Sequence, residues 1–543
     1  MTTPPPTNAD SSTTAPGAVR GGGGAWQQAN ALAAAADWPA AAACYARIAA
    51  ATPDDAAAWI GLAKARGRNG EYRAMHAATL RAAAAGPRTW PHALALARLL
   101  RDLHETRALD ALATALAARA HEAATDDMVA LADLLGGEDL HRAALEWLDR
   151  ANARDRAHAP AAYLRGGTRL FLGDMPGARR DLERAIALAP HFAHAHRRLS
   201  QLRATDRDGA AARVERLLQE RSRVAPGSEH DIHFSHALFD ELHDLGEHEA
   251  AWQALTRGAA ARRAGLRYDA ADDARLFEAI RARCDGAFVS GPGHHHAAGA
   301  PRPLFIVGMF RSGTTLLERM LGGHASIAEG GESMGFAAAL RHAVDHRARG
   351  VIDLETLRRT GGVDWPALGA AFIAGNAWRA QGRAWWTEKL PTNALLLGLV
   401  ARALPDARFV HAWRPPMDVC FSNLRMLYGG FAPWSYEQQE LAAWHRGHAA
   451  LMAHWRAVLG ERLLDVAHAD LVRAPEHELR RVLAHCGLAF APGVLQPQRA
   501  GGAVATASAA QVRDGIRAPR RPDWWPYRAH LGPLAAGLGI QLD

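Results

Sequence analysis

The sequence predicts a chain of two structural classes, an all-helical array followed by an α/β domain with a parallel sheet. From about residue 25 to 260, Ala, Leu and Arg recur at helical spacing between short Gly/Asp turns. After about residue 301, short apolar runs of strand length alternate with helical patterns. A Gly- and Pro-rich stretch separates the two patterns, which indicates a domain boundary.

The length and charge of the chain indicate how many domains it has and what kind of ligand suits it. At 543 residues the chain is too long for a single core, since one domain usually takes roughly 100–200 residues. Lys and Arg outnumber Asp and Glu by 63 to 56, a net charge of +7. This balance suits an anionic ligand, but it is too mild over this length to indicate general nucleic-acid binding, and we expect no nucleic-acid partner.

Cysteine usage and the absence of long apolar runs indicate a soluble, cytoplasmic protein. The four cysteines form no CxxC pair, so neither a disulfide framework nor a zinc site is expected. Residues 1–24 are rich in Pro, Thr, Ser and Gly without an apolar signal core, and no run of about 18 apolar residues occurs. We therefore expect a disordered leader at 1–24 and no membrane span.

The helical region shows a period of 34 residues. Pro53 and Pro87 are 34 residues apart, and Pro190 lies 103 further on, close to three more periods. Small and aromatic residues recur within these frames, among them Trp59, Leu62, Gly70, Tyr72, Gly166, Gly173, Ala178, Leu182 and Ala185. This pattern resembles tetratricopeptide repeats, helix pairs that stack because no pair buries its apolar face alone. The alternative is an irregular alanine-rich helical domain.

We expect four segments along the chain. They are the leader 1–24, a repeat solenoid 25–260 with a capping helix pair at 235–263, a helical and Gly/Pro-rich linker 261–300, and an α/β domain 301–543. His294, His295 and His296 are consecutive in the linker and lack the spacing of a closed metal site, so no metal is expected there.

Two strands with their helices define the expected α/β domain. PLFIVGM (303–309) is a buried strand that leads into a helix at 312–323. ARFVHAW (407–413) is a second strand, entered from a helix at 393–404. Strands that alternate with helices favour a parallel sheet with helices on both faces.

The loop GMFRSGTT (308–315) has the outline of a phosphate-binding loop without its lysine. Gly308 and Gly313 are separated by four residues, but a nucleoside triphosphatase would continue with Lys where this chain has Thr314. Backbone N–H groups and the helix dipole favour an anion there, and Arg311 adds a planar fork for phosphate oxygens. Hydroxyl donors are Ser312, Thr314 and Thr315. The loop therefore fits a 5′-phosphate group neutralised by protein cations instead of magnesium.

A second segment, FVHAWRPPMDVCFS, carries the matching cation. Arg414 lies at the carboxyl end of the second strand, and Ser422 follows eight residues later in the next helix. Ligands of parallel α/β sheets bind beyond the carboxyl ends of the strands, so Arg311 and Arg414 are expected to converge on one ligand with two separated phosphates. The alternative is an ordinary ion pair for Arg414 and a surface position for Ser422.

FRSGTT and RPPMDVCFS resemble the 5′-phosphosulfate loop and the 3′-phosphate segment of sulfotransferases that use 3′-phosphoadenosine-5′-phosphosulfate (PAPS). With the repeats, the chain is similar to bacterial tetratricopeptide-repeat sulfotransferases, whose catalytic part resembles tyrosylprotein sulfotransferase. The resemblance implies a P-loop-type sulfotransferase domain, PAPS as co-substrate and no metal. The residues implied to bind the donor are Arg311, Ser312, Gly313, Thr314, Thr315, Arg414 and Ser422.

The same resemblance implies the catalytic groups. Glu332, in EGGES and twenty-one residues after Arg311, would be the general base, with Glu329 as a nearby rival. Lys389, in TEKLPTN, would neutralise the bridging oxygen and leaving phosphate, a task that Arg311 would share. Gly331 and Leu390 stand where the family has acidic residues.

Further positions either match the pattern of the resembled family or depart from it. Ser508, in TAS followed by QVR, resembles a serine that contacts the nucleotide, and His468 replaces a Tyr that packs on adenine. Arg520 or Arg521 would serve as the lid cation, because Asp523 stands where a basic residue is expected. Phe310 replaces the usual Pro before the loop arginine, and Ala469 replaces a Glu.

The leading hypothesis is an enzyme that moves the sulfuryl group of PAPS to an acceptor hydroxyl, a protein tyrosine being one candidate, while the repeats recruit a protein or peptide. One alternative is a repeat scaffold with a nucleotide-binding but inactive domain. Another is an ATP-dependent phosphotransferase, which the missing lysine disfavours. The acceptor stays open, since Trp385, Trp386, Trp434 and Tyr436 are expected in the core and not around an acceptor.

Overall fold

The computed structural model of the protein describes residues 23–204, 206–496 and 521–542. The chain divides into two compact units. The first holds the residues up to Arg156 together with Ala338–Ala348, and the second holds Ala157–Ala337 and the residues from Arg349 onward. Each unit is described by itself.

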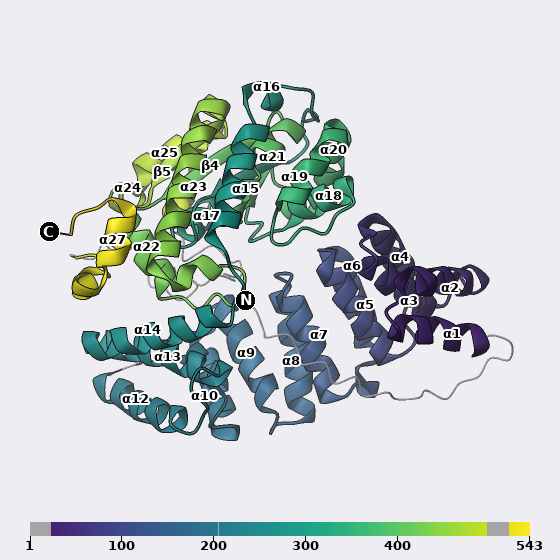
Figure 1. Cartoon of the computed structure of the whole chain (residues 1–543), viewed down its shortest axis with the longest axis horizontal. Coiled ribbons are helices and arrows are strands. Elements are labelled where there is room, and N and C mark those ends of the chain that lie inside the picture. Colours follow the sequence, from purple (N-terminus) through teal and green to yellow (C-terminus); the bar gives the residue numbers. More distant parts are fainter. Residues whose placement is uncertain (1–22, 205, 497–520, 543) are drawn as a thin grey trace. The chain divides into compact units, whose positions relative to one another are not determined.

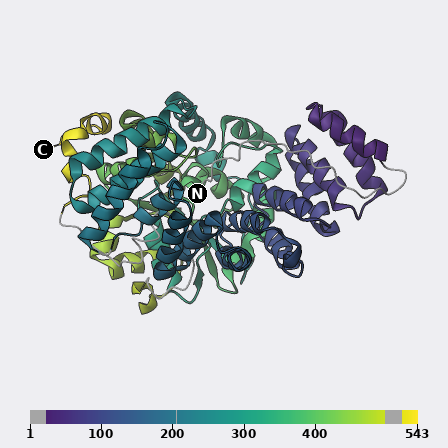
Figure 2. The ribbon, with the colours of Figure 1, turned by 90° about the horizontal axis from the view of Figure 1, so that it is seen from below.

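The first unit is built from consecutive helices that pack in pairs (Figures 1 and 2). They are α1 (Gly23–Ala34), α2 (Trp38–Ala51), α3 (Ala56–Arg68), α4 (Tyr72–Ala85), α5 (Trp90–Asp102), α6 (Thr106–Ala117), α7 (Thr125–Gly136) and α8 (His141–Arg154). Small residues let the helices approach closely. A Cβ on Gly61 of α3, for example, would lie 2.6 Å from the ring of Tyr45 on α2.

The second unit continues the helix pairs. Its first helices are α9 (Ala159–Leu172), α10 (Met175–Leu188), α11 (Ala193–Ser200), α12 (Arg207–Arg221), α13 (Glu229–Leu245) and α14 (His248–Ala264). Gly166 of α9 occupies one of the small positions of the repeat, because a Cβ there would lie 2.8 Å from Cγ of Leu182 on α10. The predicted tetratricopeptide-like solenoid is confirmed.

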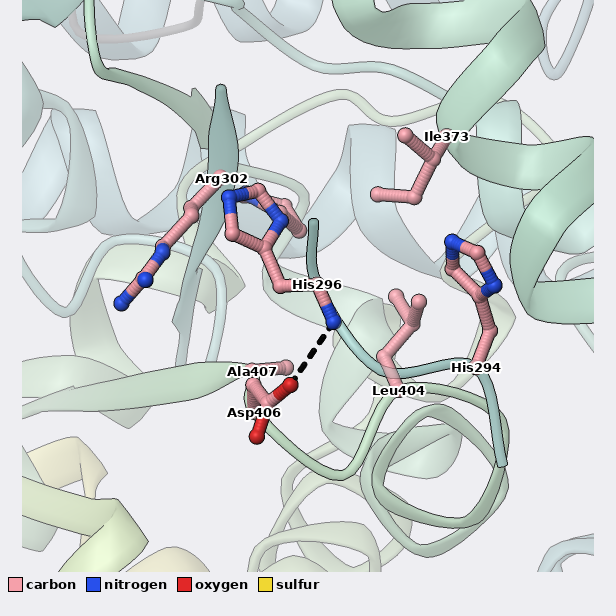
Figure 3. Close-up of a pocket in the computed structure, with 8 residues that line it drawn as sticks. His294, His296, Arg302, Ile373, Leu404, Asp406 and Ala407 are labelled. Atoms are coloured by element: carbon pink, nitrogen blue, oxygen red, sulfur yellow. Dashed lines mark hydrogen bonds between the residues drawn. The ribbon is translucent and has the colours of Figure 1, made fainter. Parts of the chain in front are cut away.

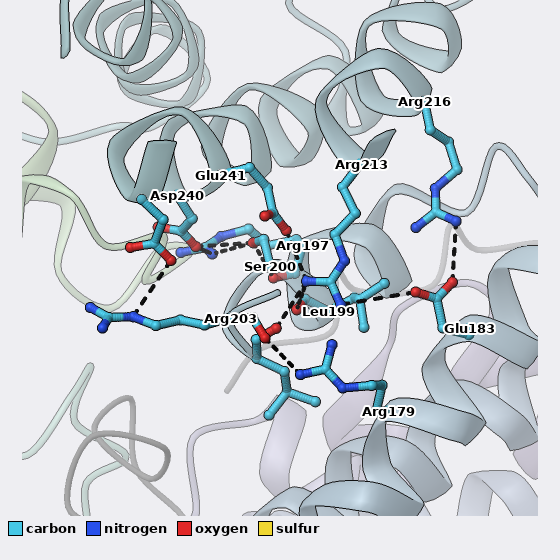
Figure 4. A network of polar contacts seen from close by, with 12 residues as sticks. Arg179, Glu183, Arg197, Leu199, Ser200, Arg203, Arg213, Arg216, Asp240 and Glu241 are labelled. Atoms are coloured by element: carbon cyan, nitrogen blue, oxygen red, sulfur yellow. Dashed lines mark hydrogen bonds and ion pairs between the residues drawn. The ribbon is translucent and has the colours of Figure 1, made fainter. Parts of the chain in front are cut away.

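Arginines of α12 join this helix to α10 and α13 (Figure 4). Arg213 donates from Nη1 to the carbonyl oxygen of Leu202 at 2.9 Å and to Oε1 of Glu241 at 3.1 Å. Arg216 donates to Glu183 at 3.1 Å. Burial raises the pKa of Glu241 to about 7, although Arg213 opposes the shift. The guanidinium of Arg213 and the carboxylate of Glu241 are thus paired in the interior, as buried polar groups need to be.

The α/β domain has a parallel sheet of order β2-β3-β1-β4-β5. The strands are β1 (Arg302–Val307), β2 (Ile327–Ala328), β3 (Trp385–Glu388), β4 (Arg408–Trp413) and β5 (Leu463–Ala467). The helices of this part of the chain are α15 (Ala270–Arg283), α16 (Gly286–Val289), α17 (Thr314–Gly322), α19 (Leu354–Arg359), α20 (Trp365–Asn376), α21 (Leu397–Ala403), α22 (Pro416–Leu424), α23 (Gln438–Leu459), α24 (His468–Arg473), α25 (Pro475–His485) and α27 (Gly532–Leu538). One more helix, α18 (Gly335–Val344), belongs to the first unit from Ala338 onward.

Side chains alternate between the two faces of β1, and helices cover both faces. Leu304 and Ile306 pack with Leu317 of α17 and Leu479 of α25 in one cluster of buried residues. Phe305 points the other way, and its ring lies 6.1 Å from that of Phe372 on α20 and 5.8 Å from that of Phe409 on β4. The predicted parallel sheet between two helical layers is confirmed.

The two strands and two helices predicted for the α/β domain coincide with observed elements. The expected strands at 303–309 and 407–413 are β1 and β4, and the expected helices at 312–323 and 393–404 contain α17 and α21. The four aromatic residues expected in the core, Trp385, Trp386, Trp434 and Tyr436, are each at most 5% exposed. The segment boundaries at 24, 260 and 300 stay predictions.

The four cysteines are free and buried. Within the described ranges, no helix combines the length and apolar character needed to cross a membrane.

Candidate active site

The loop between β1 and α17 has a backbone conformation that few other residues would allow. A Cβ on Gly308 would clash with the carbonyl oxygen of Ala412 and with Oγ of Ser312. Arg311 adopts a left-handed backbone conformation with φ of 70°, and Gly313 has φ of 101°. A non-glycine residue held in this region costs on the order of 1–3 kcal/mol, and such strain collects at functional sites.

The hydroxyl groups of the loop lie at the start of α17. Thr314 and Thr315 are its first two residues, and they are 4% and 7% exposed. Ser312 is 1% exposed, and its Oγ has no hydrogen-bond partner among the described residues. A buried hydroxyl without a partner is unusual, and a ligand oxygen in the loop would satisfy it.

The structure brings Arg311, Arg414 and Ser422 together. Nε of Arg311 donates to Oγ of Ser422 at 3.1 Å, and Nη1 of Arg414 approaches the carbonyl oxygen of Arg311 at 3.4 Å. β1 and β4 are neighbours in the sheet, so the residues after their carboxyl ends meet. Burial lowers the pKa of Arg311 to about 10, and the nearby Arg425 and Arg414 add to the shift. The guanidinium therefore stays charged at neutral pH.

Sequence reasoning missed Arg425, a third cation of this cluster. It follows Ser422 by three residues at the end of α22, and this helical spacing is the signal that could have revealed it. Its guanidinium lies 3.6 Å from Oδ2 of Asp523 and 5.2 Å from the ring centroid of Phe239. The carboxylate of Asp523, where a basic residue was expected, thus pairs with a cation beside Arg311.

His468 lies directly against the loop. It is the first residue of α24, and a Cβ on Gly313 would clash with its ring. Burial lowers the pKa of His468 to about 4, and the positive charges of Arg414 and Arg311 contribute. A flat, neutral ring therefore faces the loop at neutral pH.

The predicted acid and lysine are in contact. Nζ of Lys389 lies 2.7 Å from Oε1 of Glu332. Lys389 follows β3 directly, and Glu332 lies in the loop after β2, so two neighbouring strands deliver the pair. The side chain of Lys389 is 1% exposed whereas that of Glu332 is 31% exposed. The carboxylate is therefore partly accessible from solvent, and the ammonium lies beneath it in the interior.

Glu329, the rival carboxylate, has another partner. It pairs with Arg319 of α17 at 2.9 Å, and this arginine is 3% exposed. Burial raises the pKa of Glu329 to about 7, with the charge of Glu318 adding to the shift. Geometry thus favours Glu332 for contact with Lys389 and assigns Glu329 to a buried ion pair.

Of the three residues predicted to form the lid or to contact the nucleotide, the structure describes Arg521. Ser508 and Arg520 lie outside the described residues. The guanidinium of Arg521 lies 5.7 Å from the ring centroid of Trp525. Trp524 donates from Nε1 to Oδ1 of Asp418 on α22 at 2.8 Å, which fastens the segment after residue 520 to the helix of Ser422.

The linker histidines fix the chain beside β4 (Figure 3). The backbone N–H of His296 donates to Oδ2 of Asp406 at 2.8 Å, and that of His294 donates to the carbonyl oxygen of Ala403 at 2.8 Å. The cavity that His294 and His296 line measures about 10 Å³. In the part of the chain that the structure describes, no three His, Cys, Asp or Glu residues are grouped to hold a metal ion.

Comparison with known proteins identifies the domain that carries this site. Residues 303–492 match the family model described as "Sulfotransferase family". An uncharacterized protein of Aquifex aeolicus (strain VF5) is 26% identical over 261 residues, which are 45% of this chain and 33% of that protein. The matching part thus spans about a third of the length of this curated relative.

Solved structures similar to the chain fall into two groups. The sulfotransferase domain from the curacin biosynthetic pathway is 19% identical and covers 45% of this chain and 99% of its own, with a TM-score of 0.27. A sulfotransferase from Alicyclobacillus acidocaldarius is 19% identical and covers 45% and 98%, with a TM-score of 0.25. The TPR protein YrrB is 21% identical and covers 31% and 86%, with a TM-score of 0.25. Because these TM-scores are low, the structural similarity by itself supports no conclusion about function.

Proposed function

Because residues 303–492 form a domain of the sulfotransferase family, we propose that the protein moves the sulfuryl group of PAPS to an acceptor hydroxyl. The observation that carries the proposal is the pair of cations, Arg311 and Arg414, beyond the carboxyl ends of β1 and β4, with Lys389 and Glu332 in contact beyond β3 and β2. The family and the fold support a sulfotransferase role. PAPS, the acceptor and the roles of single residues are proposals.

The loop fits the 5′ end of PAPS. The orphaned hydroxyl of Ser312, the close approach of the backbone at Gly308 and the charge of Arg311 all suit a tetrahedral anion. Gly313, Thr314 and Thr315 complete this cradle at the start of α17. Arg414 and Ser422 would hold the 3′-phosphate. The donor supplies the sulfuryl group, and protein cations take the place of a metal.

Glu332 is proposed as the general base. Its carboxylate accepts the proton of the acceptor hydroxyl as that oxygen attacks sulfur. In the structure Oε1 accepts a hydrogen bond from Lys389, and the partial exposure of the side chain leaves it open to an acceptor. Lys389 and Arg311 would stabilise the negative charge that develops on the leaving phosphate as the bridging S–O bond breaks.

His468 and the C-terminal segment are proposed to hold the nucleoside. The ring of His468 against Gly313 offers a flat surface for adenine. Ser508 would contact the nucleotide, and Arg521 would act as a lid cation. The pairing of Asp523 with Arg425 supports a lid whose charges differ from those that the resemblance implies.

The repeats are proposed to recruit a protein or peptide. A solenoid of stacked helix pairs offers an extended surface of the kind that binds extended peptides. In the second unit, α13 and α14 contact the α/β domain directly, since Nδ1 of His243 lies 2.7 Å from the hydroxyl of Tyr527 and Arg263 pairs with Glu440. A peptide held by these helices is a reasonable source of the acceptor, and a tyrosine hydroxyl is one candidate.

The proposal is tested by measuring transfer of the radioactive sulfuryl group from labelled PAPS, in the presence of a chelator, to tyrosine-containing peptides and to sugar alcohols. We expect sulfuryl transfer that continues without magnesium. Transfer of a labelled phosphoryl group from Mg-ATP, with none of the sulfuryl group from PAPS, would instead indicate a phosphotransferase. Binding of the nucleotide without transfer to either acceptor class would favour the alternative of an inactive scaffold.

A further inference from the structure

Glu318 is a buried carboxylate to which the proposed reaction gives no role. It lies in the first turns of α17, directly beyond the phosphate loop, and is 4% exposed. Its Oε1 accepts hydrogen bonds from the hydroxyl of Thr387 at 2.6 Å and from the backbone N–H of Gly331 at 3.0 Å. Its Oε2 lies 3.6 Å from Nζ of Lys389.

These contacts join three parts of the site. Gly331 directly precedes Glu332, so its bond to Glu318 fixes the loop that carries the proposed base. Thr387 lies in β3 two residues before Lys389, so its bond fixes the strand that carries the lysine. The second carboxylate oxygen faces the ammonium group itself. One side chain on the loop's own helix therefore holds both partners of the Lys389–Glu332 pair.

The charges explain why a carboxylate stands at this position. Burial raises the pKa of Glu318, while the charge of Lys389 and the hydrogen bonds from Thr387 and Gly331 oppose the shift. Lys389 lies between two carboxylates, at 2.7 Å from Glu332 and 3.6 Å from Glu318. A buried ammonium needs such a partner, because an unpaired charge in the interior is strongly unfavourable.

We propose that Glu318 is a positioning residue that keeps Lys389 charged and in place during transfer. The role rests on the proposed function. When Glu332 takes the proton of the acceptor hydroxyl, it becomes neutral and no longer attracts the ammonium. Glu318 then remains as its anionic partner, so that Lys389 can stabilise the phosphate oxygen that receives the electron pair of the broken S–O bond. Glu318 itself neither gains nor loses a proton.

The variant Glu318→Gln tests this role. The amide oxygen of Gln still accepts from Thr387 and Gly331, but the charge that faces Lys389 is gone. We expect kcat to fall by about 10–100-fold, by analogy with partners that orient the ligands of metal sites. KM for PAPS is expected to stay unchanged. The alkaline limb of the kcat profile should move to lower pH, because an ammonium with one carboxylate fewer loses its proton more easily.

A matched control separates this role from a structural one. Glu241→Gln alters another buried carboxylate, one on α13 that accepts from Nη1 of Arg213 at 3.1 Å, and should leave the alkaline limb in place. The proposal is overturned if Glu318→Gln has the wild-type alkaline limb, or if Glu241→Gln moves it equally. Absence of transfer by the wild-type protein would overturn the proposed function and this role with it.

Discussion

Nζ of Lys389 lies 2.7 Å from Oε1 of Glu332, although 57 residues separate them along the chain. The contact forms because β2 and β3 are parallel neighbours whose carboxyl ends release the two residues at the same edge of the sheet. At this edge a partly exposed carboxylate and a buried ammonium lie near the phosphate loop. The arrangement suits removal of a proton from an acceptor together with stabilisation of a leaving phosphate.

Glu332→Gln is expected to lower kcat by about 10²–10⁴-fold, the usual contribution of a general base, because Gln cannot take up the proton. Binding of 3′-phosphoadenosine-5′-phosphate, the spent donor, should be retained. Steady-state transfer kinetics and calorimetry measure the two effects. Full transfer by this variant, with loss in Glu329→Gln, would move the base to the rival carboxylate.

Glu329→Ala is expected to lower stability more than transfer. The change removes the carboxylate that lies 2.9 Å from the buried Arg319, and breaking a buried ion pair costs about 3–5 kcal/mol. Urea unfolding of the variant checks this free energy. A loss below about 1 kcal/mol, the range of a solvent-exposed pair, would show that Arg319 finds another anion or water.

Gly308→Ala is expected to disable donor binding. The added methyl group would meet the carbonyl oxygen of Ala412, and backbone atoms of neighbouring strands cannot easily move apart. The matched control is Gly361→Ala, where nothing lies within 4 Å of the new Cβ. Calorimetry with the spent donor should show binding by the control alone. Equal affinity in the two variants would contradict the close approach at Gly308.

Binding of the spent donor is expected to take up a proton at His468. The pKa of the unliganded ring is about 4, so the ring is neutral at neutral pH. Bound phosphates favour the imidazolium and raise this pKa, so affinity should increase as the pH falls from neutral toward the raised value. Calorimetry in buffers of different ionisation enthalpy measures the uptake. Equal uptake in His468→Gln would assign the proton to the ligand.

Tyr527→Phe is expected to destabilise the second unit by about 1 kcal/mol, the net value of one hydrogen bond. The hydroxyl bonds to His243 of α13, while the ring lies 5.1 Å from that of Phe421 on α22. Phe keeps the ring contacts, so Tyr527→Ala should cost more, about 3–5 kcal/mol. Thermal unfolding of both variants checks the order. Equal effects would mean that the ring contributes nothing to the contact between α13 and α22.

The sequence predicts the parts of this site that local patterns encode. A glycine-bearing loop between a strand and a helix indicates an anion site, and the position of Arg414 after a second strand predicts its approach to Arg311. The strands β2, β3 and β5 were not predicted, and β2 and β3 have only two and four residues and no alternating pattern. Their sheet positions come from non-local pairing of β3 with β1, of β2 with β3 and of β5 with β4.

Residues that act through tertiary contacts could not be predicted. Arg425 and Asp523 are 98 residues apart, and nothing in either local sequence indicates their pairing. Glu318 occupies an ordinary helical position in LLERML, and only the fold places it against Gly331, Thr387 and Lys389. The helical region could be predicted from the sequence, because its 34-residue period reflects the packing of neighbouring repeats against one another.

Calorimetric titration with 3′-phosphoadenosine-5′-phosphate, in a chelator and beside Mg-ATP, tests the central claim most directly because it needs no acceptor. We predict metal-free binding of the bisphosphate that is lost in Arg311→Ala and Arg414→Ala and retained in Arg358→Ala, a control whose side chain is 71% exposed. A preference for Mg-ATP, or equal binding of the bisphosphate by all three variants, would contradict the account.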